Sequence, residues 1–247
     1  MQNRNGNTPE SYNQCAIIKK AIDNCNDNDI TVTSFRADAC CYQKDTIEYL
    51  ESQNITYYIR AENCLRLMDA LADEPEWQQV ILNNKKVEVC SIEEKILGSK
   101  DKYRRIVAYR YKQAGQLSID NINGYRYYAI VTSDKEKTAL QCIETYNQRG
   151  CGGEHHFKEL DYDFNRTKLP FDNMEINTIY MYAMLVGYLL FNAVKQTYAA
   201  KLSFVNTTMR IKNFILHFVT LPAKWIRTGR QWILKIFTTK EYGLLCT

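Results

Sequence analysis

The sequence predicts an α/β fold, and three features of its 247 residues support that prediction. Strand patterns rich in β-branched residues alternate with amphipathic helix patterns through residues 29–73, as in sheets whose parallel strands are joined by helices. Residues 77–133 instead alternate polar and apolar positions, which indicates antiparallel strands. Helical patterns dominate from residue 134 onward. We therefore expect an α/β body with an inserted antiparallel β module and a helical C-terminal region.

The first part of the α/β body is expected over residues 1–76. Its first strand, "DITVTSFRAD", is expected to be buried, and it ends in Asp38. The elements are predicted from periodicity and from turn residues between them. They are a helix over 10–25, a strand over 29–38, a helix over 43–53, a strand over 55–61 and a helix over 63–73 capped by Asn63.

The antiparallel β module is expected over residues 77–133. It begins with a hairpin that turns at Asn83–Lys86, and it continues with strands over 104–113 and 125–133. The last strand alternates strictly, so its side chains are expected on two opposite faces. One face holds Tyr125, Tyr127, Ala129 and Val131, and the other holds Arg126, Tyr128 and Ile130.

The second part of the body is expected over residues 134–200, and a basic helical region over 201–247. Three of the chain's ten glycines lie within residues 150–153 and are expected to break a helix, since each costs about 1 kcal/mol relative to alanine there. The predicted helices cover 135–149, 154–161, 172–199, 203–220 and 222–237.

The formal net charge of +4 is unevenly distributed along the chain. Residues 195–247 carry a net charge of +8, whereas residues 1–194 carry −4. Such a basic tail favours a polyanionic partner, either nucleic acid or a membrane surface, although a solvated basic helix pair would give the same pattern. The nine cysteines show no C-x-x-C spacing and no signal segment follows Met1, so we expect reduced, mostly buried thiols in a cytoplasmic protein.

Residues 176–194 approach the length of a membrane span. They contain Asn177, Thr178 and Asn192, and they lack an uninterrupted run of 18 apolar residues. A buried core helix is therefore the favoured interpretation over a membrane helix. We expect no stable association with membranes.

Two carboxylates are candidates for chemistry. Asp38 lies at the carboxyl end of a strand, where open α/β sheets place functional groups, although acids are also common there for structural reasons. Glu154 follows the glycine break, where a carboxylate would also complement a helix dipole. A zinc site or a Cys–His nucleophile built from Cys151, His155 and His156 is disfavoured, because further ligands and an orienting group are missing.

These segments together resemble the DDE transposases of bacterial insertion sequences, over about residues 4–235. The segment around Asp38, "FRADACCYQKDTIEYLESQNITYYIRA", resembles the one that holds that family's second catalytic acid. Tyr146, Arg149, Glu154 and Lys158, within "ETYNQRG" and "EHHFKELDYDFNRTKLP", resemble the C-terminal Tyr-Arg-Glu-Lys signature of one group of that family. "MEINTIYMYAMLVGYLLFNAVKQ" resembles the apolar helix that follows it.

The resemblance implies a ribonuclease-H-like core that binds two Mg²⁺ or Mn²⁺ ions between three carboxylates. Asp38 would be the second metal ligand and Glu154 the third, and the ions would serve cleavage and strand transfer of phosphodiesters. Arg149 and Lys158 would hold DNA phosphates, and Tyr146 would pack near the transposon end or bond a phosphate. The implied partners are transposon ends, target DNA and a full-length transposase.

The chain departs from the family pattern in three ways. The first catalytic aspartate is expected on an earlier strand, so we expect a C-terminal portion of a transposase with an incomplete core, inactive alone. Four residues separate Arg149 from Glu154 where the family has three. Asp161 stands where the family has its lysine, and Lys158 lies one helical turn earlier. We interpret residues 150–153 as a hinge that absorbs the inserted residue.

The alternative is a non-catalytic remnant that binds DNA or a full-length transposase through the basic tail. Tryptophans interleave with its cations, as in many nucleic-acid-binding surfaces. The cations expected to contact DNA are Arg210, Lys212, Lys224, Arg227, Arg230 and Lys235.

Overall fold

The computed structural model describes residues 7–9, 12–62, 64–99, 101–113, 121–122, 124–150, 155–218 and 220–238. The chain forms two compact units, which meet in the sequence between Gly152 and Gly153. The predicted glycine hinge and Glu154 lie outside the described residues, apart from Gly150, which ends a helix.

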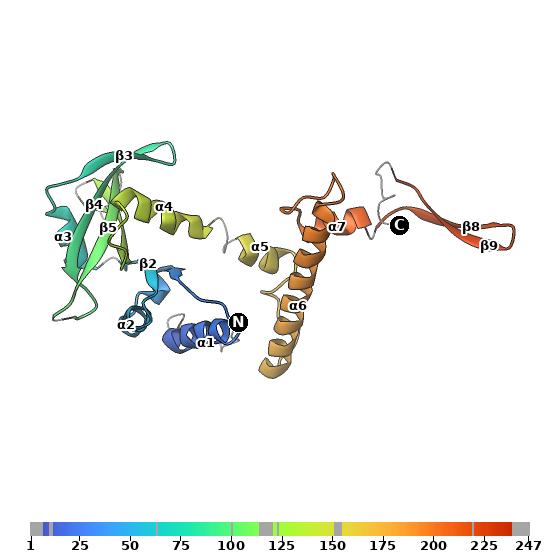
Figure 1. Cartoon of the computed structure of the whole chain (residues 1–247), viewed down its shortest axis with the longest axis horizontal. Coiled ribbons are helices and arrows are strands. Elements are labelled where there is room, and N and C mark those ends of the chain that lie inside the picture. The colour runs from blue at the N-terminus through green and yellow to red at the C-terminus, as the bar shows by residue number, and fades with distance from the viewer. Residues whose placement is uncertain are drawn as a thin grey trace. The chain divides into compact units, whose positions relative to one another are not determined.

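The first unit is built on one mixed seven-stranded sheet, with strand order β1-β2-β7-β5-β4-β3 and β6 paired to β7 (Figure 1). β1 and β2 pair in parallel, and the other neighbours are antiparallel. The strands are β1 (Ser34–Ala37), β2 (Thr56–Arg60), β3 (Gln78–Leu82), β4 (Lys85–Lys95), β5 (Tyr103–Lys112), β6 (Asn121–Ile122) and β7 (Tyr125–Thr132). The helices are α1 (Gln14–Asn26), α2 (Lys44–Ser52), α3 (Leu65–Ala72), α4 (Ala139–Arg149) and the short 3-10 helix η1 (Ala39–Cys41).

The predicted alternation of strands and helices with parallel pairing is confirmed by β1, α2, β2 and α3. The predicted hairpin is confirmed as well, because β3 and β4 pair across a two-residue loop. Asn83 and Asn84 both have positive φ there, as two-residue hairpin turns of this kind require.

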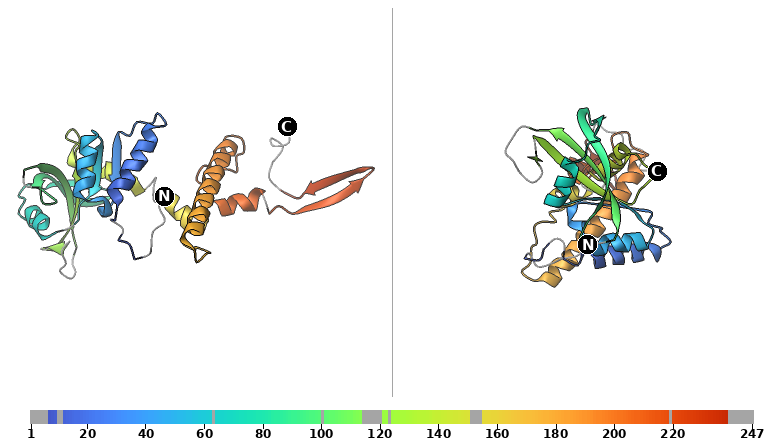
Figure 2. Two further views of the ribbon diagram at one scale, coloured as in Figure 1. Left: turned by 90° about the horizontal axis from the view of Figure 1, so that it is seen from below. Right: turned by 90° about the vertical axis from the view of Figure 1, so that its left-hand side faces the viewer.

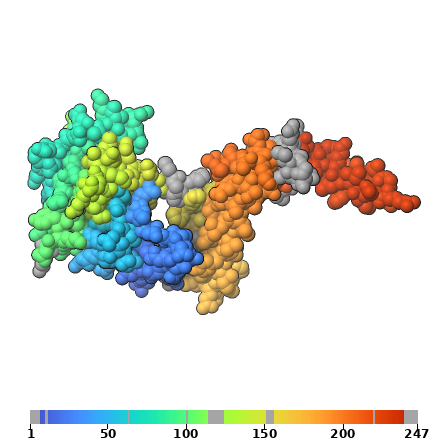
Figure 3. All heavy atoms as spheres, viewed as in Figure 1, coloured from blue at the N-terminus to red at the C-terminus, as the bar shows by residue number. Residues whose placement is uncertain are grey.

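Helices cover both faces of the sheet. One face packs against α1, α2 and α3 through a core that includes Ile22, Leu50 and Met68. The opposite face packs against α4, whose Cys142 and Ile143 are completely buried there. Spheres of α4 lie directly on those of the strands (Figure 3). The sheet therefore orients α4 rigidly relative to the ends of β1 and β2.

Two expectations for the first unit are wrong. The strand predicted over 29–38 is shorter, spanning Ser34–Ala37, and only Ala37 is buried. Among the described residues β1 pairs on one side only, which leaves its other edge and several side chains exposed. The cap residue of α3 is Cys64 rather than Asn63, which itself lies outside the described residues.

In its described residues, the second unit contains three helices and a two-stranded hairpin. Its elements are α5 (His155–Tyr162), α6 (Met174–Ala199), α7 (Ile211–Phe218), β8 (Ala223–Thr228) and β9 (Gln231–Ile236). The helix predicted over 203–220 is thus restricted to its second half.

The helix predicted over 222–237 is wrong, because these residues form the β8–β9 hairpin, the red ribbon of Figure 2. Gly229 adopts a φ of 62° in the two-residue loop between the strands, a backbone conformation that suits glycine. Trp225 pairs with Leu234, and Arg227 pairs with Trp232 across the strands. Apolar residues at positions 225, 226, 232, 233 and 236 lie three, four or seven positions apart, which is also the spacing of one helical face.

The long apolar helix α6 buries one stripe of side chains within its unit, including Met181, Tyr188 and Phe191. Ile179, Leu190 and other apolar side chains of α6 are exposed, so the expected complete burial is not met within this unit. By length and composition α6 is apolar enough to cross a membrane, and 17% of its most apolar window is buried.

Candidate nucleic-acid and metal site

Asp38 lies immediately after β1, at the carboxyl end of the parallel β1–β2 pair. Its carboxylate accepts a hydrogen bond from the backbone N–H of Cys40 at 3.2 Å and so caps η1. Its side chain is 53% exposed. The capping bond fixes one oxygen of Asp38, and the exposure leaves the group accessible to a ligand.

The C-terminal turn of α4 brings two further predicted residues to Asp38. The Arg149 guanidinium lies 3.9 Å from the Asp38 carboxylate. The same guanidinium lies over the ring of Tyr146 at 5.8 Å from its centroid. Asp38 precedes Tyr146 by 108 positions and Arg149 by 111 positions in the sequence. The fold of the first unit therefore makes neighbours of these three residues, all predicted from the sequence.

The surroundings of Asp38 shift the pKa of two neighbours. Burial raises the pKa of Tyr146, while Arg149 and Arg60 act to lower it. Burial, and next the charge of Asp38, raise the pKa of the Cys41 thiol to about 11. Cys41 is therefore protonated at neutral pH and is not a thiolate nucleophile.

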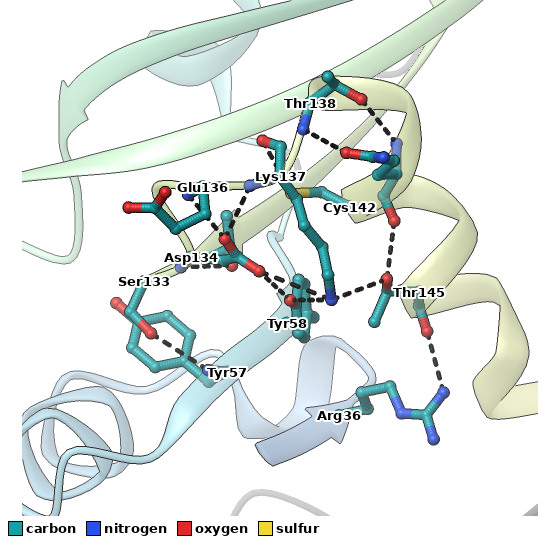
Figure 4. A network of polar contacts seen from close by, with 12 residues as sticks. Arg36, Tyr57, Tyr58, Ser133, Asp134, Glu136, Lys137, Thr138, Cys142 and Thr145 are labelled. Atoms are coloured by element: carbon teal, nitrogen blue, oxygen red, sulfur yellow. Dashed lines mark hydrogen bonds and ion pairs between the residues drawn. The ribbon is translucent and has the colours of Figure 1, made fainter. Parts of the chain in front are cut away.

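A network of polar contacts fixes the beginning of α4 on the sheet (Figure 4). Asp134 accepts hydrogen bonds from the Tyr58 hydroxyl and from the backbone N–H of Lys137, the latter at 3.0 Å. The Lys137 ammonium donates to the Tyr58 hydroxyl at 2.9 Å and to the Thr145 hydroxyl at 3.3 Å. Arg36 of β1 donates to the backbone carbonyl of Thr145 at 2.9 Å. The network thus couples α4 to β1 and β2.

Sequence features specify the start of α4. Thr138 and Gln141 form a capping box, in which each side chain accepts a hydrogen bond from the other's backbone N–H. Burial acts to raise the pKa of Asp134, but hydrogen bonds from Tyr58 and from two backbone N–H groups outweigh it and hold the pKa below its usual range. Asp134 is therefore ionised at neutral pH and serves as a structural acceptor.

Tyr58→Phe is expected to lower the free energy of unfolding by about 1–3 kcal/mol, because Asp134 and Lys137 lose a buried hydroxyl partner. Urea unfolding followed by circular dichroism measures the change. Tyr103→Phe is the control, since Tyr103 is 57% exposed. Equal losses in both variants would show that the network contributes nothing to stability.

The other predicted DNA contacts belong to the second unit. Lys158 is exposed on α5. Arg210 and Lys212 both form ion pairs with Asp163, at 2.5 Å and 3.6 Å. Arg210 chiefly holds the pKa of Asp163 below its usual range, so these charges partly neutralise one another. The four remaining cations are exposed on the β8–β9 hairpin or in its loop, and they are Lys224, Arg227, Arg230 and Lys235.

The described residues fit a divalent metal only in part. Asp38 offers the carboxylate oxygens that Mg²⁺ and Mn²⁺ prefer. Within the described ranges, however, no group of three or more His, Cys, Asp or Glu side chains could hold a metal ion. Glu154, the predicted second donor from this chain, lies outside those ranges. The described part of the chain supplies one ligand, not a complete site.

Several residues of the candidate site and of the network that holds α4 on the sheet were not singled out from the sequence, namely Arg36, Tyr58, Arg60, Asp134 and Lys137. Arg60 could have been found from the sequence, because it is the last residue of β2. Its position at the carboxyl end of a parallel strand is thus similar to that of Asp38, which follows β1. The others had none, since the contacts that join them to other elements span 76 to 109 positions in the sequence.

An exposed carboxylate at the carboxyl ends of parallel strands, with arginine and tyrosine beside it, defines an α/β protein suited to a phosphate-bearing ligand. The family is more specific. The model of the family described as "Transposase DDE domain group 1" matches residues 1–243, and the chain belongs to this family of DDE transposases. The family acts in DNA transposition and generally uses divalent metal ions. No curated protein matches the chain significantly.

Proposed function

We propose that this chain takes part in the cleavage and joining of DNA during transposition of a bacterial insertion sequence. The observation that supports this best is the cluster of Asp38, Arg149 and Tyr146 at the end of β1. It combines an accessible hard carboxylate with groups that bind phosphate. Membership of the transposase family supports the same function.

In this proposal Asp38 and Glu154 would hold Mg²⁺ or Mn²⁺ ions in a ribonuclease-H-like core. Such ions, when bound as a pair, activate the attacking oxygen and stabilise the leaving oxygen of a phosphodiester. Arg149 and Tyr146 would position the scissile phosphate by donating hydrogen bonds to its oxygens. In the second unit, Lys158 would hold a further phosphate. The protein would act in the bacterial cytoplasm on transposon ends and target DNA.

A second candidate function is non-catalytic binding of DNA or of a full-length transposase. One observation favours it, namely that four cations of the basic tail are exposed on the β8–β9 hairpin or in its loop. The exposed cations of the β8–β9 hairpin would supply the affinity, since contacts to phosphates are electrostatic and independent of sequence.

One experiment separates the two candidates. The purified chain is incubated with a supercoiled plasmid that contains the DNA on both sides of its own reading frame, with and without Mg²⁺ or Mn²⁺. Metal-dependent nicking supports the catalytic function. DNA binding without nicking supports the second function. If the chain neither nicks nor binds the DNA, both candidate functions are rejected.

Salt dependence shows whether the hairpin provides the binding. With four phosphate contacts, DNA affinity is expected to fall by about a hundredfold as salt rises from about 50 to 200 mM. Replacing Lys224, Arg227, Arg230 and Lys235 by glutamine is expected to flatten that dependence. An unchanged salt slope in this variant would exclude the hairpin as the DNA contact.

A further inference from the structure

A row of tyrosine and arginine side chains crosses the α4-bearing face of the sheet beside the candidate site. We name it the tyrosine–arginine strip. Tyr128 of β7 pairs directly with Tyr109 of β5. Two residues away on each strand, Arg126 pairs with Tyr111 on the same face of the sheet. Arg60 of β2 pairs with Ile130, two residues from Tyr128 on the same face. The strip consists of Arg60, Tyr109, Tyr111, Arg126 and Tyr128.

The members of the strip stack on one another. The rings of Tyr109 and Tyr128 are nearly parallel, with centroids 4.8 Å apart, and Tyr111 stacks on Tyr128 at 6.0 Å. The guanidinium groups of Arg60 and Arg126 lie 5.0 Å and 5.4 Å from the centroid of the Tyr128 ring. Stacking holds each guanidinium in a defined orientation, which lowers the entropy cost of binding an anion.

Arg60 of the strip differs in its contacts from the arginines on the opposite face of the sheet. There Arg104 and Arg110 pair with Glu51 and Glu88 at 2.9 Å and 2.6 Å. Arg60, by contrast, forms no ion pair or hydrogen bond with any carboxylate in the described part of the chain, and its recorded contact is the Tyr128 ring. Its guanidinium donors are thus available to an acceptor from outside.

The strip is continuous with the candidate site. Tyr109 of the strip and Tyr146 of the site pack against the same buried cluster of the first unit. The charge of Arg60 acts to lower the pKa of both tyrosines, against the effect of burial. Tyr146 in turn lies under Arg149, which faces Asp38. A ligand bound at Asp38 could therefore continue onto the strip within the same unit.

We propose that the tyrosine–arginine strip binds the sugar–phosphate backbone of the DNA strand whose reacting phosphate lies at Asp38. Guanidinium and tyrosine hydroxyl groups donate to phosphate oxygens, and the hydroxyls of Tyr111 and Tyr128 lie only 3.4 Å apart. Stacking of bases is disfavoured, because the ring faces of Tyr109 and Tyr128 already cover one another. The identity of the ligand as DNA rests on the proposed function.

The test measures binding of a labelled 30-base-pair duplex by fluorescence anisotropy, without metal and at several salt concentrations. The double variant Arg60→Gln/Arg126→Gln is expected to weaken binding about tenfold and to reduce the salt slope by about 2. Tyr128→Phe keeps the stacked ring, removes the hydroxyl and is expected to weaken binding about threefold. Lys112→Gln and Tyr125→Phe, on β5 and β7 but on the opposite face, serve as matched controls with less than twofold change.

Unchanged affinity and salt slope in the arginine variant, with an unchanged urea midpoint, would overturn the proposal. Loss of binding on substitution of the hairpin cations, with none on substitution of the strip, would overturn it while leaving a DNA-binding function intact. Absence of any DNA binding by the wild-type chain would overturn both. Because no metal is present, failure of DNA cleavage does not affect the result.

Discussion

Asp38→Asn is expected to lower metal-dependent DNA nicking by about a hundredfold or more. Asparagine has the same shape, and its side-chain oxygen can still accept the Cys40 N–H that Asp38 accepts at 3.2 Å. The variant therefore keeps the cap of η1 but removes the negative charge that a hard cation requires. Initial nicking rates in Mg²⁺, on the plasmid described above, measure the effect.

DNA affinity is expected to respond differently from the nicking rate. The variant removes a negative charge that lies 3.9 Å from the Arg149 guanidinium and that repels phosphate, so affinity stays equal or rises. The matched control is Asp69→Asn on α3, an exposed acid far along the sequence from the site. Equal nicking by wild type and Asp38→Asn would contradict the proposed role of Asp38. Mn²⁺ binding measured by electron paramagnetic resonance gives a second readout, which should weaken in the variant.

The parts of the fold that were predicted correctly have strong local signals. The alternation around β1, α2, β2 and α3 follows from periods of two and 3.6 that each segment shows by itself. The β3–β4 turn follows from Asn83 and Asn84, which tolerate positive φ. The β8–β9 hairpin was missed because the apolar residues at 225, 226, 232, 233 and 236 are also three, four or seven positions apart, as on one side of a helix.

The candidate site was only partly predictable for a related reason. Tyr146 and Arg149 were found through a short signature in which both lie on one helix. Their meeting with Asp38 depends on how α4 is placed on the sheet, and that placement depends on tertiary contacts of Tyr58, Asp134 and Lys137. Such contacts join distant segments and have no period in the sequence, so only the folded structure reveals them.

Glu51→Ala is expected to lower the free energy of unfolding by about 3 kcal/mol or more. The Glu51 carboxylate accepts hydrogen bonds from Arg104 at 2.9 Å and 3.2 Å, from Lys102 at 2.6 Å and from Tyr57 at 3.0 Å. The Arg104 side chain is only 3% exposed, so truncation of Glu51 leaves a buried guanidinium without its counter-ion. Urea unfolding at pH 7 measures the loss.

The matched control is Glu48→Ala, three residues earlier on the same helix. Glu48 and its partner Lys44 are about half exposed and 3.9 Å apart, so we expect a loss of at most about 0.5 kcal/mol. A loss at Glu51 no larger than that at Glu48 would show that the Arg104 ion pair does not stabilise the sheet.

The difference between wild type and Glu51→Ala is also expected to depend on pH. Burial acts to raise the pKa of Glu51, but the hydrogen bonds from Arg104, Lys102 and Tyr57 outweigh it and hold the pKa below its usual range. The unfolded chain therefore takes up a proton at Glu51 at higher pH than the folded one, and the stabilisation is complete above the unfolded pKa of about 4.3. This stabilisation is lost as the pH falls through the lower pKa of Glu51 in the folded chain.

The difference in unfolding free energy between wild type and Glu51→Ala should be constant between about pH 6 and 8 and shrink below about pH 4.5. Because Arg104 stays charged throughout, a difference that stays constant down to pH 3 would show that packing, and not the ionised carboxylate, is what Glu51 contributes.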